Sequence, residues 1–302
     1  MKAWITLLFL YPLLILSQEI DSNNLLNKAD SLIQIGEYDN AIEKLNSMIK
    51  LDPKMVQGYF KRGLCQQKVG KNYEAIVDFN KAIKLAPNKP LIYCERANAY
   101  NNLGKTEKAL IDLNKAISIA PNKSKIYCKR ADFFHNQKKY TQAINDFNNA
   151  LLLDPENPKT LINRGCSYHI SGKDKEAIDD FSKAIKINPH DVKTYYNRAI
   201  SYNHLGKSKK AILDYNSAIA LDSTNAKYYT NRADSYNNLG EYKKASNDCN
   251  KAILLDPNSP QAYINRGVAK WNLKLNFCSD FKKACNISDK KEFCHNYKKY
   301  CN

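Results

Sequence analysis

Glycine and proline are scarce in this chain of 302 residues, with ten of each. Acidic residues are also few, because 30 Asp and Glu face 47 Lys and Arg, which gives a formal net charge of +17. The sequence contains no phosphate-binding glycine loop, no HExxH helix and no GxSxG turn, and its five histidines show no spacing typical of metal ligands. We therefore expect no enzyme activity, no catalytic residues, no metal and no cofactor.

Long apolar runs are limited to one, at residues 3–17. This run is shorter than the ~20 residues that span a bilayer, and Pro12 interrupts it. It therefore predicts a signal peptide at 1–17 that is cleaved near Ser17, in preference to a retained membrane anchor. Loss of Lys2 would leave a charge of +17 − 1 = +16 on an exported chain, periplasmic or extracellular, which would rarely meet nucleic acid.

Most prolines recur every 34 residues, at Pro53, Pro87, Pro121, Pro155, Pro189 and Pro257. Ser223 stands at the one place in this series that lacks proline. Each proline ends a helical phrase such as NKAILLDPN, because proline cannot donate the next backbone hydrogen bond. Inside each unit an amphipathic stretch ends at a turn, which carries a glycine at Gly36, Gly70, Gly104, Gly172, Gly206 and Gly240. A second helix follows, with pairs of alanines seven residues apart.

This helix-turn-helix unit resembles the tetratricopeptide repeat. The resemblance implies an all-α, right-handed superhelical solenoid of antiparallel helix pairs, in which the first helices line a concave groove. We expect seven full repeats and part of an eighth over 22–276, followed by a helical cap over 277–302. No unit should be stable alone, because each buries its apolar face on its neighbours.

One place on the first helix carries arginine and one place on the second helix carries aspartate. In the first repeat Lys28 stands at the arginine place and Lys44 at the aspartate place, so the arginine and the aspartate are lost together. We interpret them as structural ion pairs, in preference to a series of arginines that binds anions. The predicted pairs are Arg62 with Asp78, Arg96 with Asp112, Arg130 with Asp146, Arg164 with Asp180, Arg198 with Asp214, Arg232 with Asp248, and Arg266 with Asp280.

The groove places of the first helices are polar. The first Asn series comprises Asn163, Asn197, Asn231 and Asn265, and the second Asn series comprises Asn101, Asn203 and Asn237. Side-chain amides both donate and accept, so both series could hydrogen-bond the backbone of an extended peptide. The Lys series would favour acidic segments: Lys125, Lys159, Lys193 and Lys227. A solvated polar face without a ligand is the alternative.

Four of the nine cysteines crowd the C-terminal end, at Cys278, Cys285, Cys294 and Cys301. In an antiparallel helical hairpin, facing residues have a constant sum of residue numbers, which pairs Cys278 with Cys301 and Cys285 with Cys294. These two disulfides fit an oxidising compartment. A four-cysteine zinc site is the rival, but its usual closely spaced cysteine pairs are missing.

These features favour a non-enzymatic interaction scaffold that binds an extended peptide or protein segment, of acidic character, in the groove. The alternative is a binder of an acidic polymer or an anionic envelope surface through the +16 charge. We expect no nucleic acid partner and no stable membrane insertion after signal cleavage. The sequence does not determine the oligomeric state.

Overall fold

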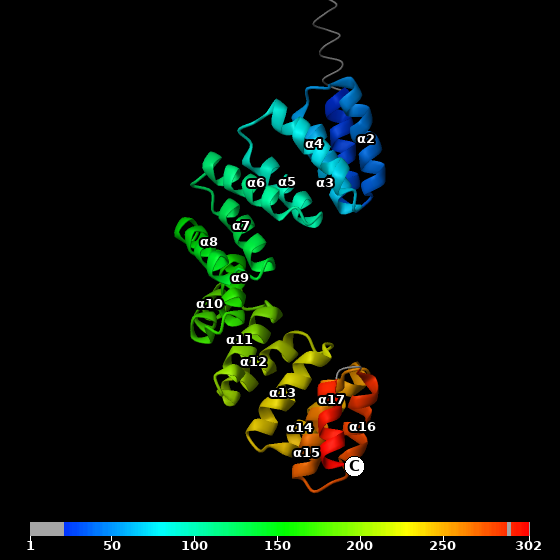
Figure 1. Cartoon of the computed structure of the whole chain (residues 1–302), viewed down its shortest axis with the longest axis vertical. Helices are drawn as coiled ribbons and strands as arrows, with labels where there is room; N and C mark the ends of the chain where they lie inside the picture. The colour runs from blue at the N-terminus through cyan, green and yellow to red at the C-terminus, as the bar shows by residue number, and fades with distance from the viewer. Residues whose placement is uncertain (1–20, 289–290, 302) are drawn as a thin grey trace, which may run out of the picture. The chain divides into compact units, whose positions relative to one another are not determined.

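The computed structural model describes residues 21–288 and 291–301, so the predicted signal peptide lies outside the described residues. Within these ranges the chain forms helices joined by short turns, with no strand (Figure 1). The helices follow one another as pairs, which confirms the predicted all-α architecture. The chain divides into two compact units between Arg130 and Ala131. The predicted limits of the array and cap stay a prediction.

Both units are built from alternating first and second helices. The first unit contains a helical stretch at 21–34, α2 (Tyr38–Leu51), α3 (Val56–Lys68), α4 (Asn72–Leu85), α5 (Pro90–Asn102), α6 (Thr106–Ile119) and the start of α7 (Ser124–Asn136). The second contains the rest of α7, α8 (Tyr140–Leu153), α9 (Pro158–Ile170), α10 (Asp174–Ile187), α11 (Val192–His204), α12 (Ser208–Leu221), α13 (Ala226–Asn238), α14 (Tyr242–Leu255), α15 (Pro260–Asn272), α16 (Cys278–Ile287) and α17 (Lys291–Tyr300). Odd-numbered helices from α3 to α15 are the first helices of their repeats.

The core between paired helices depends on small residues. All six predicted alanine pairs are buried, including Ala177 and Ala184, which are at most 1% exposed. A Cβ atom on Gly165 would lie 2.7 Å from Cε1 of the fully buried Phe181 ring. Glycine leaves room for this ring, because even the single Cβ atom of alanine would force the ring or the backbone to shift.

The turn within each repeat uses a left-handed residue to end the first helix. The six predicted turn glycines have φ between 68° and 84°. Beyond Gly70, the Lys71 amide donates to the Gln66 carbonyl at 2.7 Å, as in a Schellman motif. Two other repeats use lysine at this place, Lys138 with φ 59° and Lys274 with φ 58°. These lysines retain the turn at the expense of a strained backbone.

Replacing Lys138 with glycine should raise the free energy of unfolding by about 0.5–1 kcal/mol, because glycine adopts positive φ without a Cβ clash. Lys138 is exposed, so the change removes little packing. Urea denaturation would measure the difference. As the reverse control, Gly172→Lys should destabilise the chain by a similar amount, and an unchanged midpoint for both variants would contradict the strain argument.

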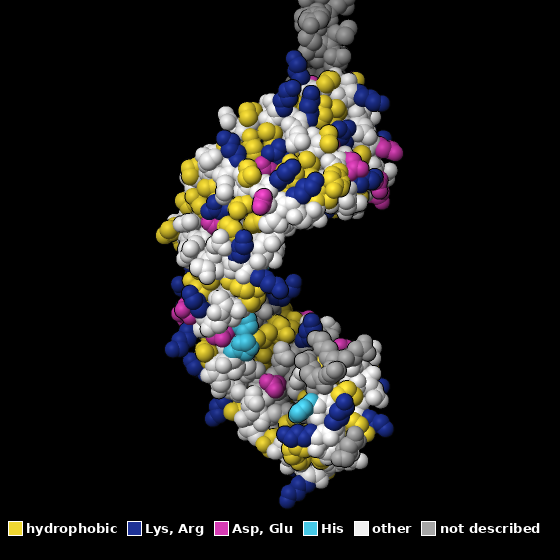
Figure 2. Space-filling model, viewed as in Figure 1, with side chains coloured by type: hydrophobic (Ala, Val, Ile, Leu, Met, Phe, Trp, Pro, Cys, Tyr) yellow, Lys and Arg dark blue, Asp and Glu magenta, His cyan; other side chains and the backbone are white. Residues whose placement is uncertain are grey.

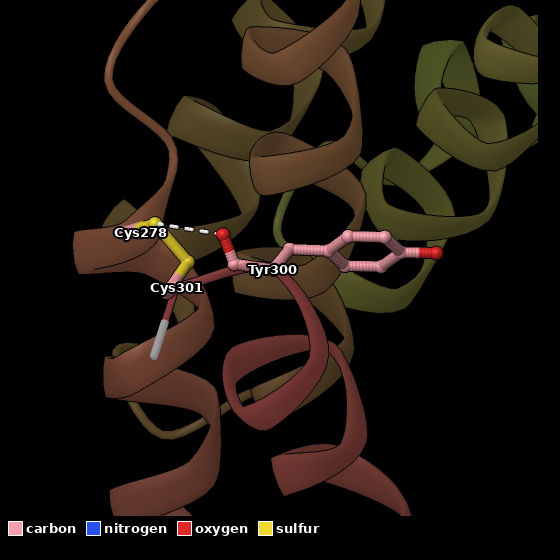
Figure 3. The surroundings of a disulfide bond; sticks show 3 residues. All are labelled: Cys278, Tyr300 and Cys301. Atoms are coloured by element: carbon pink, nitrogen blue, oxygen red, sulfur yellow. Dashed lines mark hydrogen bonds between the residues drawn. A yellow bond between two sulfur atoms is a disulfide. The ribbon is translucent and has the colours of Figure 1, made fainter.

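The C-terminal end is closed by both predicted disulfides. Cys278 is bonded to Cys301 with Cα atoms 5.6 Å apart, and Cys285 to Cys294 with Cα atoms 4.4 Å apart. Figure 3 shows the first bond beside Tyr300, whose ring points away from the sulfurs. The disulfides join α16 to the residues of α17 and just beyond, so the last two helices form a covalently closed hairpin.

Candidate binding groove

Six of the predicted ion pairs are present, each with two parallel hydrogen bonds. In the Arg164 pair, Nε and Nη2 donate to the Asp180 carboxylate at 2.7 and 2.6 Å. The same geometry joins Arg62 to Asp78, Arg96 to Asp112, Arg198 to Asp214, Arg232 to Asp248 and Arg266 to Asp280. The Arg130–Asp146 pair would cross the boundary of the two units and stays a prediction.

Each of these arginines also reaches back to the preceding repeat, which the sequence analysis missed. The third nitrogen, Nη1 of Arg164, donates to Asn148 Oδ1 at 2.8 Å. The equivalent acceptors for the other five are Asn46, Asn80, Ser182, Asn216 and Asn250, and Arg130 donates in the same way to Asn114. The sequence does mark these acceptors, because Asn or Ser stands first in each repeated phrase, as Asn250 does in NKAILLDPN. The arginines therefore connect neighbouring repeats.

The first Asn series is engaged in contacts between neighbouring first helices. Asn163 Nδ2 donates to Asp132 at 3.0 Å, and Asn231 Nδ2 donates to the Tyr196 hydroxyl at 3.0 Å. Asn265 is buried and donates to the Thr230 carbonyl at 3.0 Å. Asn197 Nδ2 approaches Cys166 Sγ at 3.5 Å. These amides therefore link α7 with α9, α9 with α11, α11 with α13, and α13 with α15.

The second Asn series is half-buried on the first helices α5, α11 and α13. Asn203 Oδ1 accepts from Ser235 at 2.9 Å, and Asn237 Nδ2 donates to the Asn265 carbonyl at 2.9 Å. The Oδ1 atom of Asn237 is buried and has no hydrogen-bond partner among the described residues. A buried amide oxygen without a donor is energetically unfavourable, but the same burial keeps this atom out of reach of a ligand in the present side-chain arrangement.

All four members of the Lys series are exposed at the second residue of their helices α7, α9, α11 and α13. A cation in the first turn interacts unfavourably with the helix dipole, and this interaction typically costs about 0.3–1 kcal/mol at low ionic strength. Helix stability therefore does not explain this placement. Elsewhere Lys and Arg are spread over the visible surface among hydrophobic and uncharged side chains (Figure 2).

A recess of about 370 Å³ lies on the groove side of α7 and α9, lined by Asp132, His135, Asn136, Asn163 and Cys166. A larger one, of about 490 Å³, is lined mainly by apolar side chains of α8 and α9, among them Leu151 and Leu161, and includes Arg164. The smaller recess contains one of the predicted groove residues, Asn163. Its lining is mostly polar, whereas that of the larger recess is mostly apolar.

Comparison with known proteins decides the family. Tetratricopeptide repeat models match residues 56–89, 90–123, 158–191, 192–225 and 226–259, and a second model of the same repeat matches 22–55 and 124–157. The chain belongs to the tetratricopeptide repeat family. The matches cover residues 22–259 without a gap, at the boundaries that the proline period predicts. No curated protein matches the chain.

Solved tetratricopeptide repeat proteins share the fold. The MamA protein is 27% identical over 56% of this chain and 93% of its own, with a TM-score of 0.52. A tetratricopeptide repeat protein from Parabacteroides merdae is 23% identical over 82% of this chain and 98% of its own, with a TM-score of 0.57. YrrB, a tetratricopeptide repeat protein with an unusual peptide-binding site, is 21% identical over 61% of this chain and 95% of its own, with a TM-score of 0.54.

Four of the five cysteines inside the repeats have side chains whose burial disfavours the nucleophilic thiolate. Burial raises the pKa of Cys65 and Cys166 to about 11, and that of Cys94 and Cys249 to about 12. The thiolate is the reactive form, so these side chains are almost entirely protonated near neutral pH. They act as small packing residues.

Within 21–288 and 291–301, no helix has the length and apolar character that crossing a bilayer requires.

Asp234 is a half-buried carboxylate on the first helix α13, and burial raises its pKa above the ordinary value. Asp234→Asn should therefore stabilise the repeats at neutral pH, by about 0.5–1 kcal/mol. The folded-state pKa is the higher one, so the penalty of the ionised group is present above it. The penalty disappears as the pH falls toward the unfolded value of ~3.9.

Urea denaturation of both proteins between neutral and acidic pH would measure this difference. The exposed Asp179→Asn is the control and should change stability little at any pH. A gap between wild type and Asp234→Asn that widens on acidification would show that the sign is wrong.

Proposed function

We propose that this tetratricopeptide repeat protein is a non-enzymatic scaffold that binds an extended, acidic protein segment along the first helices. The observation that carries the proposal is the Lys series, whose members Lys159, Lys193 and Lys227 lie exposed at one place on three consecutive first helices of the second unit. Acidic side chains of a ligand would meet both the ammonium groups and the positive helix ends.

The fold supports binding of a partner protein, because tetratricopeptide repeat arrays expose one continuous face of stacked first helices. YrrB, with the same fold, has an unusual peptide-binding site. The structure changes one detail of the expectation. The first Asn series already donates to neighbouring helices, so it shapes the groove floor and offers fewer free donors than the sequence suggests.

A charge-reversal experiment tests the site. Lys159, Lys193 and Lys227, all replaced by Glu, should abolish capture of acidic peptides from a displayed library by the full chain. The matched control replaces the exposed Lys175, Lys209 and Lys243 of the second helices α10, α12 and α14 by Glu, which makes the same change in net charge. It should leave capture intact. Equal loss in both variants would contradict a groove site.

Binding of an acidic polymer or an anionic envelope surface is the second candidate, favoured by the net charge of +17 − 1 = +16 that remains after loss of Lys2. That mode depends on overall charge, so both triple variants should weaken binding to heparin or to anionic vesicles equally. It should also collapse steeply between low and moderate salt. Binding of a peptide in the groove should depend on which lysines are changed.

We also propose that the chain is exported, with the segment 1–17 removed. The two disulfides support an oxidising compartment. N-terminal sequencing of the protein from its native compartment should begin at or near Gln18, whereas a retained Met1 would contradict cleavage.

A further inference from the structure

Two histidines and one aspartate from three consecutive helices meet at a single point in the second unit. His169 lies near the end of α9, Asp174 begins α10 and His204 ends α11. His169 Nδ1 lies 2.6 Å from Asp174 Oδ1, and His204 Nδ1 lies 3.6 Å from Asp174 Oδ2. The two imidazole rings lie 4.7 Å apart. One ligand atom of each residue lies within 4.8 Å of the others.

The burial of the three side chains differs in a way that suits a metal site. The Asp174 side chain is only 8% exposed, that of His169 is 22% exposed and that of His204 is 58% exposed. The carboxylate is therefore held in place by the fold, while the outer imidazole borders solvent and leaves an approach for an ion. Figure 2 shows histidine side chains at the surface of the region where Figure 1 places α9 to α11.

The chemistry of the three side chains fits zinc, and a small rearrangement would give the spacing that zinc requires. Imidazole nitrogen and carboxylate oxygen are common Zn²⁺ ligands, at ~2.0–2.2 Å from the ion, which places the ligand atoms of a tetrahedral site roughly 3.3 Å apart. His204 Nδ1 lies 3.6 Å from Asp174 Oδ2, close to that value, whereas the 2.6 Å between His169 Nδ1 and Asp174 Oδ1 is the distance of a hydrogen bond, which the ion would replace. Rotation of the exposed His204 side chain and a small movement of His169 would be sufficient to admit the ion.

The repeat itself does not require these residues. The place of Asp174 is held in other repeats by Asn72, Thr106, Tyr140, Ser208 and Tyr242, none of which is acidic. The place of His204 is held by Asn102, Asn136, Ile170 and Asn238. Only the place of His169 has a second histidine, His135, whose Nδ1 lies 2.8 Å from Ser167 Oγ. The acid and the outer imidazole thus depart from the repeat pattern together, and they do so beside His169.

We propose that His169, Asp174 and His204 form a Zn²⁺ site that joins two consecutive repeats, with water as a further ligand. His169 and Asp174 belong to the repeat at 158–191, and His204 belongs to the next one, at 192–225. A bound ion would therefore link neighbouring repeats on the groove side, near Asn203. This inference does not depend on the proposed peptide ligand.

Zinc titration of the metal-stripped full chain by calorimetry, with Zn²⁺ as the only added ligand, tests the site. Wild type should bind one equivalent saturably. His204→Ala and Asp174→Asn should each weaken the affinity at least about tenfold, because each removes a ligand. His135→Ala is the matched control, since it removes the histidine at the same place in the preceding repeat, and it should bind as wild type does.

A second readout separates a metal site from a purely structural cluster. Co²⁺ bound by wild type should give the visible absorption of a tetrahedral nitrogen and oxygen site, and Zn²⁺ should raise the melting temperature of wild type but not of His204→Ala. His204 is largely exposed, so this variant should keep its far-ultraviolet circular dichroism. Absence of saturable Zn²⁺ binding, equal binding by His204→Ala and wild type, or a thiolate-to-cobalt band would each overturn the proposal.

Discussion

Asp180→Ala should lower the free energy of unfolding by about 2–4 kcal/mol, because it leaves the Arg164 guanidinium half-buried without its carboxylate. The Asp180 side chain is 3% exposed and that of Arg164 is 16% exposed, so water can hydrate the abandoned charge only in part. The loss also reaches the preceding repeat, because Arg164 holds Asn148 while it is fixed by Asp180. Chemical denaturation monitored by circular dichroism would measure the effect.

Two variants make this prediction sharp. Asp179→Ala removes the neighbouring carboxylate, which is exposed, and should change stability by less than about 0.5 kcal/mol. Arg164→Met combined with Asp180→Ala should recover part of the loss, because no unpaired charge remains. If Asp180→Ala unfolded at the same denaturant concentration as Asp179→Ala, the ion pair would contribute nothing to stability.

Replacing Cys278 and Cys301 by Ser should destabilise the C-terminal hairpin by about 3 kcal/mol, because the disulfide closes a loop with a sequence separation of 23. The hairpin buries Phe281 against Gly267 of α15, so its loss would expose the end of the last repeat. Amide hydrogen exchange should speed up in α15 to α17. Exchange in α9 to α11 should change little, because helices in a repeat array contact only their neighbours.

The second disulfide provides a comparison for this result. Cys285 and Cys294 are only nine residues apart, so their replacement by Ser should have a smaller effect, about 2–3 kcal/mol. Unchanged exchange in α15 to α17 after loss of both disulfides would mean that packing alone holds the cap in place.

The repeated places were predictable because each is required by a local contact that recurs every 34 residues. The turn residue needs positive φ, and Gly165 needs space for the Phe181 ring, so glycine recurs at the first place, with two lysines, and glycine or alanine recurs at the second. The cysteine pairing was also predictable, since residue numbers determine which positions face each other in a helical hairpin. The family and the all-α fold follow from this recurrence.

The side-chain partners across repeats were harder to predict. The sequence shows that Asn163 and Asn231 share a place, but it does not show that their amides are directed to Asp132 and the Tyr196 hydroxyl. Those acceptors occupy different places in their own repeats, so no common period marks them.

By itself, the sequence determined the repeat, the arginine–aspartate pairs that are present and the cysteine pairing, because the first two depend on places that recur along the chain and the third on residue numbers with a constant sum. Only the tertiary structure brought Asp174 to His169 and His204, and only it decided which groove amides are already occupied. The physical reason is that stacking places residues from successive repeats within a few ångströms of one another. Which atoms then meet depends on side-chain direction and on the particular neighbour, and a repeat period specifies neither.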